Sequence, residues 1–248
     1  MARPQTQTAR PAAALLDAFR FVIAHRWPCL VRAVPVIVMT GLIAWLETNI
    51  LASAEYFRLV VNDILYAIFA VYWHRYTLLE EARESPESGL HFGLREIRYA
   101  GAMVGAAIVT LVLGKLYVVS NGGNVSAASV VLFVGLLLLC FLPLMFVFPA
   151  IALDQPIRLV PFVRSVIDMF LPLLGVMLLA LVAVVGLYGL IYLPMLLLVL
   201  LKWPEMAGIL FYLLSSFVIM PFVLAVGISF VSFLYRDAAA GEPFTPVR

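Results

Sequence analysis

The chain has few charges and few cysteines for its length, and each shortage excludes a class of protein. Only 12% of its 248 residues are charged and 65% are hydrophobic, whereas soluble domains are usually about 45–50% apolar. We therefore expect the bilayer, rather than water, to be its solvent. The two cysteines, Cys29 and Cys140, show no pair spacing, so disulfide chemistry is not expected.

Motifs that carry chemistry are also missing. The sequence has no G-x-S-x-G, Walker A or G-x-G-x-x-G run, and its three histidines, His25, His74 and His91, show no metal-ligand spacing. Its basic residues are spread out, which argues against nucleic-acid binding. We expect no metal, no cofactor and no enzymatic activity. A membrane-embedded enzyme stays a minor alternative, with His74, Glu80 and Asp154 as its only candidates.

Six long apolar stretches are what the chain does contain. Each is near or above the ~20 residues that cross a bilayer, and they lack the alternation of barrel strands. The fold class is therefore predicted to be all-α, a polytopic membrane protein with six transmembrane helices. The expected spans are Leu30–Glu47, Leu59–Leu79, Tyr99–Val119, Ala127–Phe148, Phe170–Tyr192 and Met206–Tyr235, with Leu193–Trp203 as a short re-entrant or interfacial piece after Pro194.

Basic residues mark one side of these spans. Of the sixteen Lys and Arg residues, all but Arg58, Lys115 and Lys202 lie on one side of the spans, in the alternate gaps, in the end segments or within a few residues of the adjoining span ends. Since cytoplasmic loops carry the excess of positive charge, both termini are predicted to be cytoplasmic. The domains expected are an N-terminal segment 1–28, a transmembrane domain 29–236 and a tail 237–248. No cleavable signal peptide is visible, so the first span is expected to target the chain.

Amphipathic segments precede some of the spans. Apolar residues recur at helical spacing between Ala12 and Trp27, which predicts an interfacial elbow helix bracketed by Pro11 and Pro28. The pattern R-x-V-I-x-x-x-x-P-x-L then appears twice, from Arg20 and again from Arg164, before the first and fifth spans. Residues 93–98, before the third span, form a degenerate third copy. Chance similarity and a true duplication both remain open.

Asn62 and Asp63 are the most costly polar residues in the predicted spans. They lie about one turn inside the outer end of the second span, where an ionisable group indicates a transport pathway by default. The alternative is that Asp63 pairs with Arg58 or Lys115 near the outer interface.

Aromatic, charged and small residues suggest three further roles. Trp27, Trp73, His74 and Arg75 are expected to anchor helices at the headgroups. The loop residues Glu80, Glu81, Arg83 and Glu84 form either a solvated helix end or a docking surface for a partner. Gly101 and Gly105 give the third span a small-x-x-x-small face for helix packing.

Two runs resemble a known family. Tyr72-Trp-His-Arg-Tyr-Thr-Leu-Leu-Glu80 resembles the WHR-(F/Y)-x-LL-x-E run of uncharacterised six-span inner-membrane proteins of proteobacteria, and Pro149-Ala-Ile-Ala-Leu-Asp154 is similar to their second mark. These proteins are grouped with the membrane domain of some glycerophosphodiester phosphodiesterases. The resemblance implies a polytopic domain with interfacial helices in the inner membrane, and it supplies no phosphodiesterase site.

The functional expectation is binding within the membrane. We expect an accessory or assembly subunit of a membrane complex, or a lipid-organising element, whose partners are the bilayer and a membrane protein or a second copy of the chain. The alternative is a small transporter or lipid translocator that uses Asn62, Asp63 and helices broken at Pro143, Pro149, Pro194 and Pro221.

Overall fold

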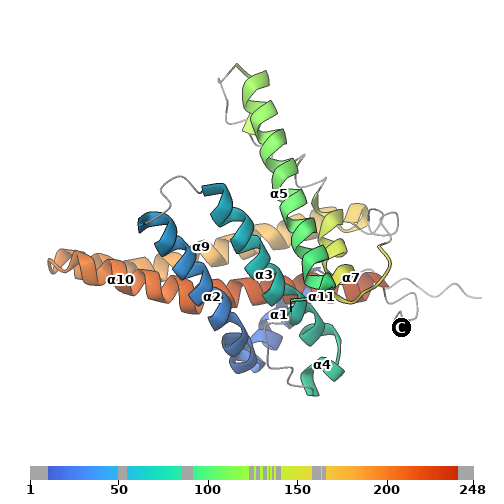
Figure 1. Cartoon of the computed structure of the whole chain (residues 1–248), viewed down its shortest axis with the longest axis horizontal. Coiled ribbons are helices and arrows are strands. Elements are labelled where there is room, and N and C mark those ends of the chain that lie inside the picture. The colour runs from blue at the N-terminus through green and yellow to red at the C-terminus, as the bar shows by residue number, and fades with distance from the viewer. Residues whose placement is uncertain are drawn as a thin grey trace, which may run out of the picture. The chain divides into compact units, whose positions relative to one another are not determined.

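The computed structural model describes residues 11–49, 55–84, 92–122, 126, 129–130, 133, 135, 137, 141–157, 163 and 166–239. All the secondary structure in these residues is helical, which confirms the predicted all-α class (Figure 1). Four stretches are long and apolar enough to cross a membrane. They are Arg26–Ile43 within α2 (Arg26–Asn49), α5 (Leu94–Ser120), α9 (Phe170–Leu200) and the continuous stretch Pro204–Ala239. The protein is therefore a helical, membrane-embedded protein by length and composition.

The second and the fourth predicted spans are not among these four stretches. The second corresponds to α3 (Glu55–Leu78), which is less apolar because it carries Asn62 and Asp63 and ends with His74 and Arg75. The fourth lies largely outside the described residues. Its expected start is marked by Ser126, whose hydroxyl accepts a hydrogen bond from the Ser129 amide at 3.2 Å, as an N-cap residue does.

The chain divides into two compact units. Unit 1 consists of Met1–Leu42 and Met169–Gly241, and unit 2 of Ile43–Asp168 and Glu242–Arg248. Unit 1 contains α1 (Pro11–Ala24), most of α2, α9, α10 (Pro204–Leu214), the π-helix η2 (Ser215–Ile219) and α11 (Met220–Ala239). Unit 2 contains α3, α4 (Glu81–Glu84), α5, the 3-10 helix η1 (Pro143–Phe146) and α7 (Val147–Ala152).

In unit 1, α1 packs on α11 and α9 through a face of small side chains. Ala14, Ala18 and Val22, spaced four residues apart, are buried. The helix predicted before the first span is thus present, but it ends at Ala24 rather than near Trp27. Pro28 explains the break, because it has no N–H to bond the Ala24 carbonyl.

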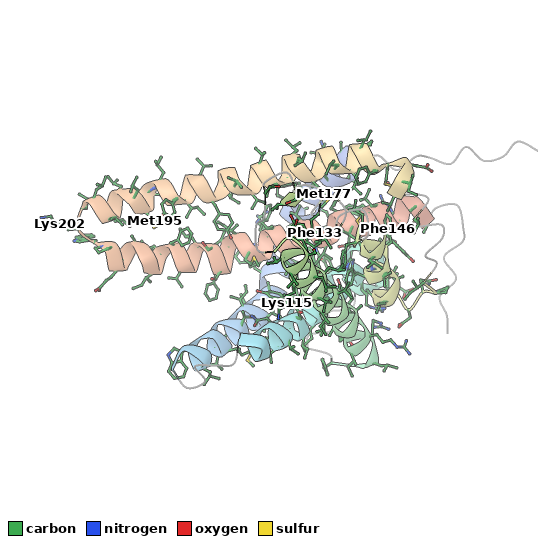
Figure 2. All side chains as sticks on the ribbon, turned by 90° about the horizontal axis from the view of Figure 1, so that it is seen from above. Lys115, Phe133, Phe146, Met177, Met195 and Lys202 are labelled. Atoms are coloured by element: carbon green, nitrogen blue, oxygen red, sulfur yellow. The ribbon has the colours of Figure 1, made fainter. Side chains whose placement is uncertain are left out.

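The arms α9 and α10 form a hairpin with Lys202 at its tip (Figure 2). Lys202 has a φ of 67°, and the amide of Trp203 donates to the Leu198 carbonyl at 2.9 Å, which ends α9 in a Schellman motif. Because α9 continues through Pro194 to Leu200, the prediction of a separate re-entrant or interfacial piece is wrong. A proline within a helix removes one hydrogen bond, and packing against α10 compensates. Met195 is buried between the arms, and the rings of Tyr192 and Phe211 lie 5.8 Å apart.

In unit 2, the second half of α3 packs against the start of α5 and against α7. The buried side chains are large and largely aromatic on α3 and small on α7. They include Phe69, Val71, Trp73 and Tyr76 of α3, Tyr99 and Ala100 of α5, Phe146 just before α7, and Ala150 and Ala152 of α7. The rings of Trp73 and Tyr76 stack with centroids 5.2 Å apart. This core positions the polar residues described next.

Candidate functional site

The two sequence runs that carry the family resemblance meet in unit 2. Arg75, at the end of α3, donates a hydrogen bond from its guanidinium to the Ala152 carbonyl at the end of α7, over 3.3 Å. Carbonyls in the last turn of a helix have no partner within the helix, and a cation there also interacts favourably with the helix dipole. Arg75 therefore ties α3 to α7.

The first turn of α5 is joined to the end of α7 by an ion pair. Arg95, in the first turn of α5, donates from Nε to the Asp154 Oδ2 at 2.9 Å and also from Nη2 to the same oxygen. Asp154 follows Leu153, the C-cap residue of α7, and has a φ of 54°, in the left-handed region. The Gln155 amide donates to the Ala150 carbonyl at 2.8 Å, so α7 ends in a Schellman motif with Asp154 at the position usually held by glycine.

Beneath this ion pair lies a buried polar contact. His74 Nε2 and the Tyr99 hydroxyl form a hydrogen bond of 3.1 Å, and the two residues are only 1% and 4% exposed. The Tyr99 ring also lies against Phe148, with centroids 5.0 Å apart. The geometry satisfies both polar groups while leaving them inaccessible to solvent. This arrangement suits a structural link between α3 and α5 better than acid–base chemistry.

The predicted partner loop has one structural member. Arg83, in α4, donates from Nε to the Tyr76 carbonyl at 2.9 Å and from Nη2 to the Thr77 carbonyl at 2.7 Å, and so caps α3. Glu80 and Glu81 are exposed. The Glu84 side chain lies outside the described residues.

The start of α5 is capped from within. The Glu96 side chain, which is buried, accepts a hydrogen bond from the Gly93 amide at 2.9 Å. A carboxylate in the first turn of a helix also complements the helix dipole. Residues 93–98, expected as a third elbow, are here the N-cap and first turns of α5 itself, with no break before its apolar part.

The four predicted membrane anchors differ in exposure. Trp27 is 68% exposed, whereas Trp73 and His74 are buried in the core of unit 2. Burial favours a packing role for these two residues over contact with headgroups. Arg75 is half-buried and hydrogen-bonded to Ala152, as described above.

Gly101 and Gly105 do not meet another helix closely within the described chain. A Cβ placed at either glycine would have no neighbouring atom within 4 Å, and Gly101 is exposed. Among the described residues, no other element therefore covers Gly101 and Gly105 of α5.

Asn62 and Asp63 are half-buried on α3. The Asn62 Oδ1 atom is buried and has no hydrogen-bond partner in the part of the chain that the structure describes. Within the described part of the chain, no ion pair joins Asp63 to Lys115, and the Arg58 side chain lies outside that part. An unsatisfied buried amide oxygen is costly and calls for an explanation.

The prolines of the transport alternative fall into two groups. Pro143 begins η1, and Pro221 follows η2, so the helical hydrogen-bond pattern changes at both. Pro149 lies near the start of α7 and Pro194 lies inside the uninterrupted α9. Pro221 lies in a helical stretch that runs without a gap from Pro204 to Ala239, so among the described residues only Pro143 coincides with an expected interruption.

Sequence reasoning had not singled out Arg95 or Tyr99 as site residues. They lie four residues apart on α5, and a signal was available: Glu96 and Arg95 are charged residues in a first turn directly before an apolar span. No group of three or more His, Cys, Asp or Glu side chains in the described residues could hold a metal ion. Comparison of the chain with protein-family models, curated proteins and solved structures gives no match.

Proposed function

We propose that the chain is an inner-membrane protein with six spans and cytoplasmic termini that acts by binding within the bilayer. The four apolar helices and the one-sided distribution of Lys and Arg support this orientation. In this proposal α3 and the segment from Ala127 supply the two remaining spans. The likeness of the runs around Trp73 and Pro149 to six-span proteins agrees with it.

The length of the α9 arm supports an interfacial position for α1. Its 31 residues extend over roughly 46 Å, which exceeds the ~30 Å hydrocarbon layer. Leu173 and Val176, at the base of the arm, are buried, and α1 packs on this helix. If α1 lies outside the hydrocarbon layer and covers the base of α9, only the rest of α9 has to cross that layer. The length of this part of α9 is closer to the thickness of the hydrocarbon layer. This supports our proposal that α1 is an elbow helix at the cytoplasmic interface.

The observation that carries a binding function is the open face of α5. Its buried residues, Glu96, Tyr99 and Ala100, all lie in its first two turns. From Gly101 to Ser120 the helix has no buried residue, although Tyr117 near its end stacks on Phe133 and donates to the Ser129 hydroxyl. Gly101 and Gly105 have no close neighbour among the described residues, so a close neighbour fits there. The occupant is either a membrane-protein partner, including a second copy of the chain, or a lipid.

The polar residues of unit 2 support binding over catalysis. Arg75, Arg83 and Arg95 each bond a helix end or the ion-pair partner Asp154, and the His74–Tyr99 pair is closed to solvent. These contacts hold three helices in register. A rigid base for α5 is what a binding surface on that helix needs.

Native mass spectrometry tests the proposal. The tagged full-length chain would be extracted from its native membrane in a mild detergent. We expect a stoichiometric protein partner, a second copy or a defined lipid to remain bound. A bare monomer under conditions that preserve known membrane complexes would contradict the proposal.

A second function, transport of a proton or cation, is favoured by the Asn62 oxygen. An unsatisfied buried acceptor next to the Asp63 carboxylate resembles part of a pathway that a cation or water would complete. Proton flux into proteoliposomes, followed with an entrapped pH-sensitive dye under a potassium diffusion potential, tests this function. Flux that depends on Asp63, and falls in Asp63→Asn, supports it. Flux no higher than in protein-free liposomes would remove it.

A further inference from the structure

The first turns of α5 combine two arginines with exposed apolar side chains. Arg95 and Arg98 lie three residues apart, so they are neighbours on the helix surface. Asp154 engages the Nε and Nη2 groups of Arg95, which leaves Nη1 without an acceptor in the described residues. Arg98 is exposed and has no bond to any other described side chain. Together with Asp154, the two arginines carry one net positive charge, because the Glu96 carboxylate between them is buried on the other side of α5 and accepts from the Gly93 amide.

Apolar side chains surround this charge. Phe92, Leu94 and Ile97 are 55%, 64% and 51% exposed. Basic side chains interleaved with exposed apolar ones suit the boundary between headgroups and acyl chains, where apolar groups enter the acyl layer and guanidinium groups meet phosphates. The same alternation on a surface facing water would be unfavourable.

The open glycines continue this surface along α5. Leu94, Arg98, Gly101 and Gly105 follow one another at helical spacing and so share the face opposite to the buried Glu96. Gly101 lies roughly 4.5 Å, and Gly105 roughly 10 Å, along the axis from Arg98. A phosphate at Arg98 would therefore place the start of an acyl chain beside the two glycines.

We propose that this face, with Arg98, Gly101 and Gly105, binds one anionic phospholipid together with Arg95 at its edge. Its phosphate contacts Arg98 and Nη1 of Arg95, and one acyl chain lies along the glycines. The net charge of the site matches a headgroup with one negative charge, whereas a zwitterionic headgroup would add a cation. Asp154 acts as a positioning residue, because it fixes the Arg95 guanidinium. This inference rests on the proposed binding function and names the occupant.

The experiment compares lipid retention in matched variants. Full-length protein would be reconstituted into nanodiscs of equimolar phosphatidylglycerol and phosphatidylcholine, and the lipids retained after release would be counted by native mass spectrometry. We expect the wild type to prefer phosphatidylglycerol. Arg98→Gln should lower the ratio of the two lipids about tenfold, in the range of one charge-assisted hydrogen bond. Lys115→Gln, which removes an exposed charge near the opposite end of the same helix, should leave the ratio unchanged.

A second variant tests the acyl-chain contact. Gly105→Leu should reduce retention of both lipids without changing their ratio, because it blocks the chain rather than the headgroup. The substituted side chain points into open space, so the fold should persist, as gel filtration would check. Equal loss of selectivity in Arg98→Gln and Lys115→Gln would overturn the inference.

The partner alternative gives a different outcome. If Gly105→Leu dissociates a protein partner or a second copy while lipid retention stays constant, the lipid inference is wrong and the binding function stands. If the wild type retains neither lipid nor partner, both proposals fail.

Discussion

Asp154 holds Arg95 from a backbone conformation that an aspartate seldom adopts. Its φ of 54° lies in the left-handed region, yet its carboxylate receives both Nε and Nη2 of the guanidinium. Glycine would end α7 without this strain, but it would leave Arg95 unpaired. The residue at this position thus combines a helix stop with an anchor for the first turn of α5.

Substitutions of Asp154 should separate these two roles. Asp154→Ala should lower the apparent Tm of the detergent-solubilised protein by up to about 4 °C, because alanine keeps the left-handed backbone conformation and loses an ion pair worth about 0–1 kcal/mol. Asp154→Gly should stay close to the wild type, since relief of strain offsets a partly exposed pair worth about 0–1 kcal/mol. A lower Tm for the glycine variant than for the alanine variant would contradict this account.

Removing the Tyr99 hydroxyl should destabilise unit 2. Tyr99→Phe keeps the ring against Phe148 but removes the hydrogen bond to the buried His74. Loss of a buried hydrogen bond costs about 1–3 kcal/mol, so a clear drop in apparent Tm is expected. Tyr192→Phe is the matched control, because Tyr192 is 62% exposed. Equal effects of the two substitutions would show that the His74 contact contributes little.

A larger side chain on the buried face of α1 should destabilise unit 1. Ala18 is fully buried where α1 packs in unit 1, so Ala18→Leu would force side chains apart at a cost of about 1–3 kcal/mol. Leu16→Ala, on the exposed side of the same helix, should change the apparent Tm little in detergent. Limited proteolysis would report whether α1 has detached. An intact α1 with unchanged Tm in Ala18→Leu would argue against the packing described.

The sequence was sufficient for the helical class but not for contacts between distant segments. Long apolar runs predict helices, because an unpaired backbone group is costly in a bilayer and few other structures satisfy all of them. Pro194 led to a wrong prediction. The helix was expected to be interrupted there, but α9 continues through Pro194 and packs on α10. The meeting of Arg75 with Ala152, 77 residues apart, depends on how α3 and α7 pack, and no local pattern encodes it. Burial of Trp73 was missed for the same reason, because an aromatic-basic run has the same composition at an interface or in a core.

Lys202, at the tip of the α9–α10 hairpin, allows the cost of a left-handed backbone conformation to be measured without the loss of an ion pair. Lys202 has a φ of 67° and is exposed, and no salt bridge to it occurs among the described residues. Lys202→Gly should therefore raise stability by about 1 kcal/mol, which corresponds to roughly 2–4 °C in apparent Tm. Lys115→Gly, a substitution of the same residue types inside α5, should lower it by a similar amount through helix propensity. Opposite signs for the two substitutions would confirm that backbone conformation decides the outcome. A fall in both would mean that the Lys202 side chain itself stabilises the turn.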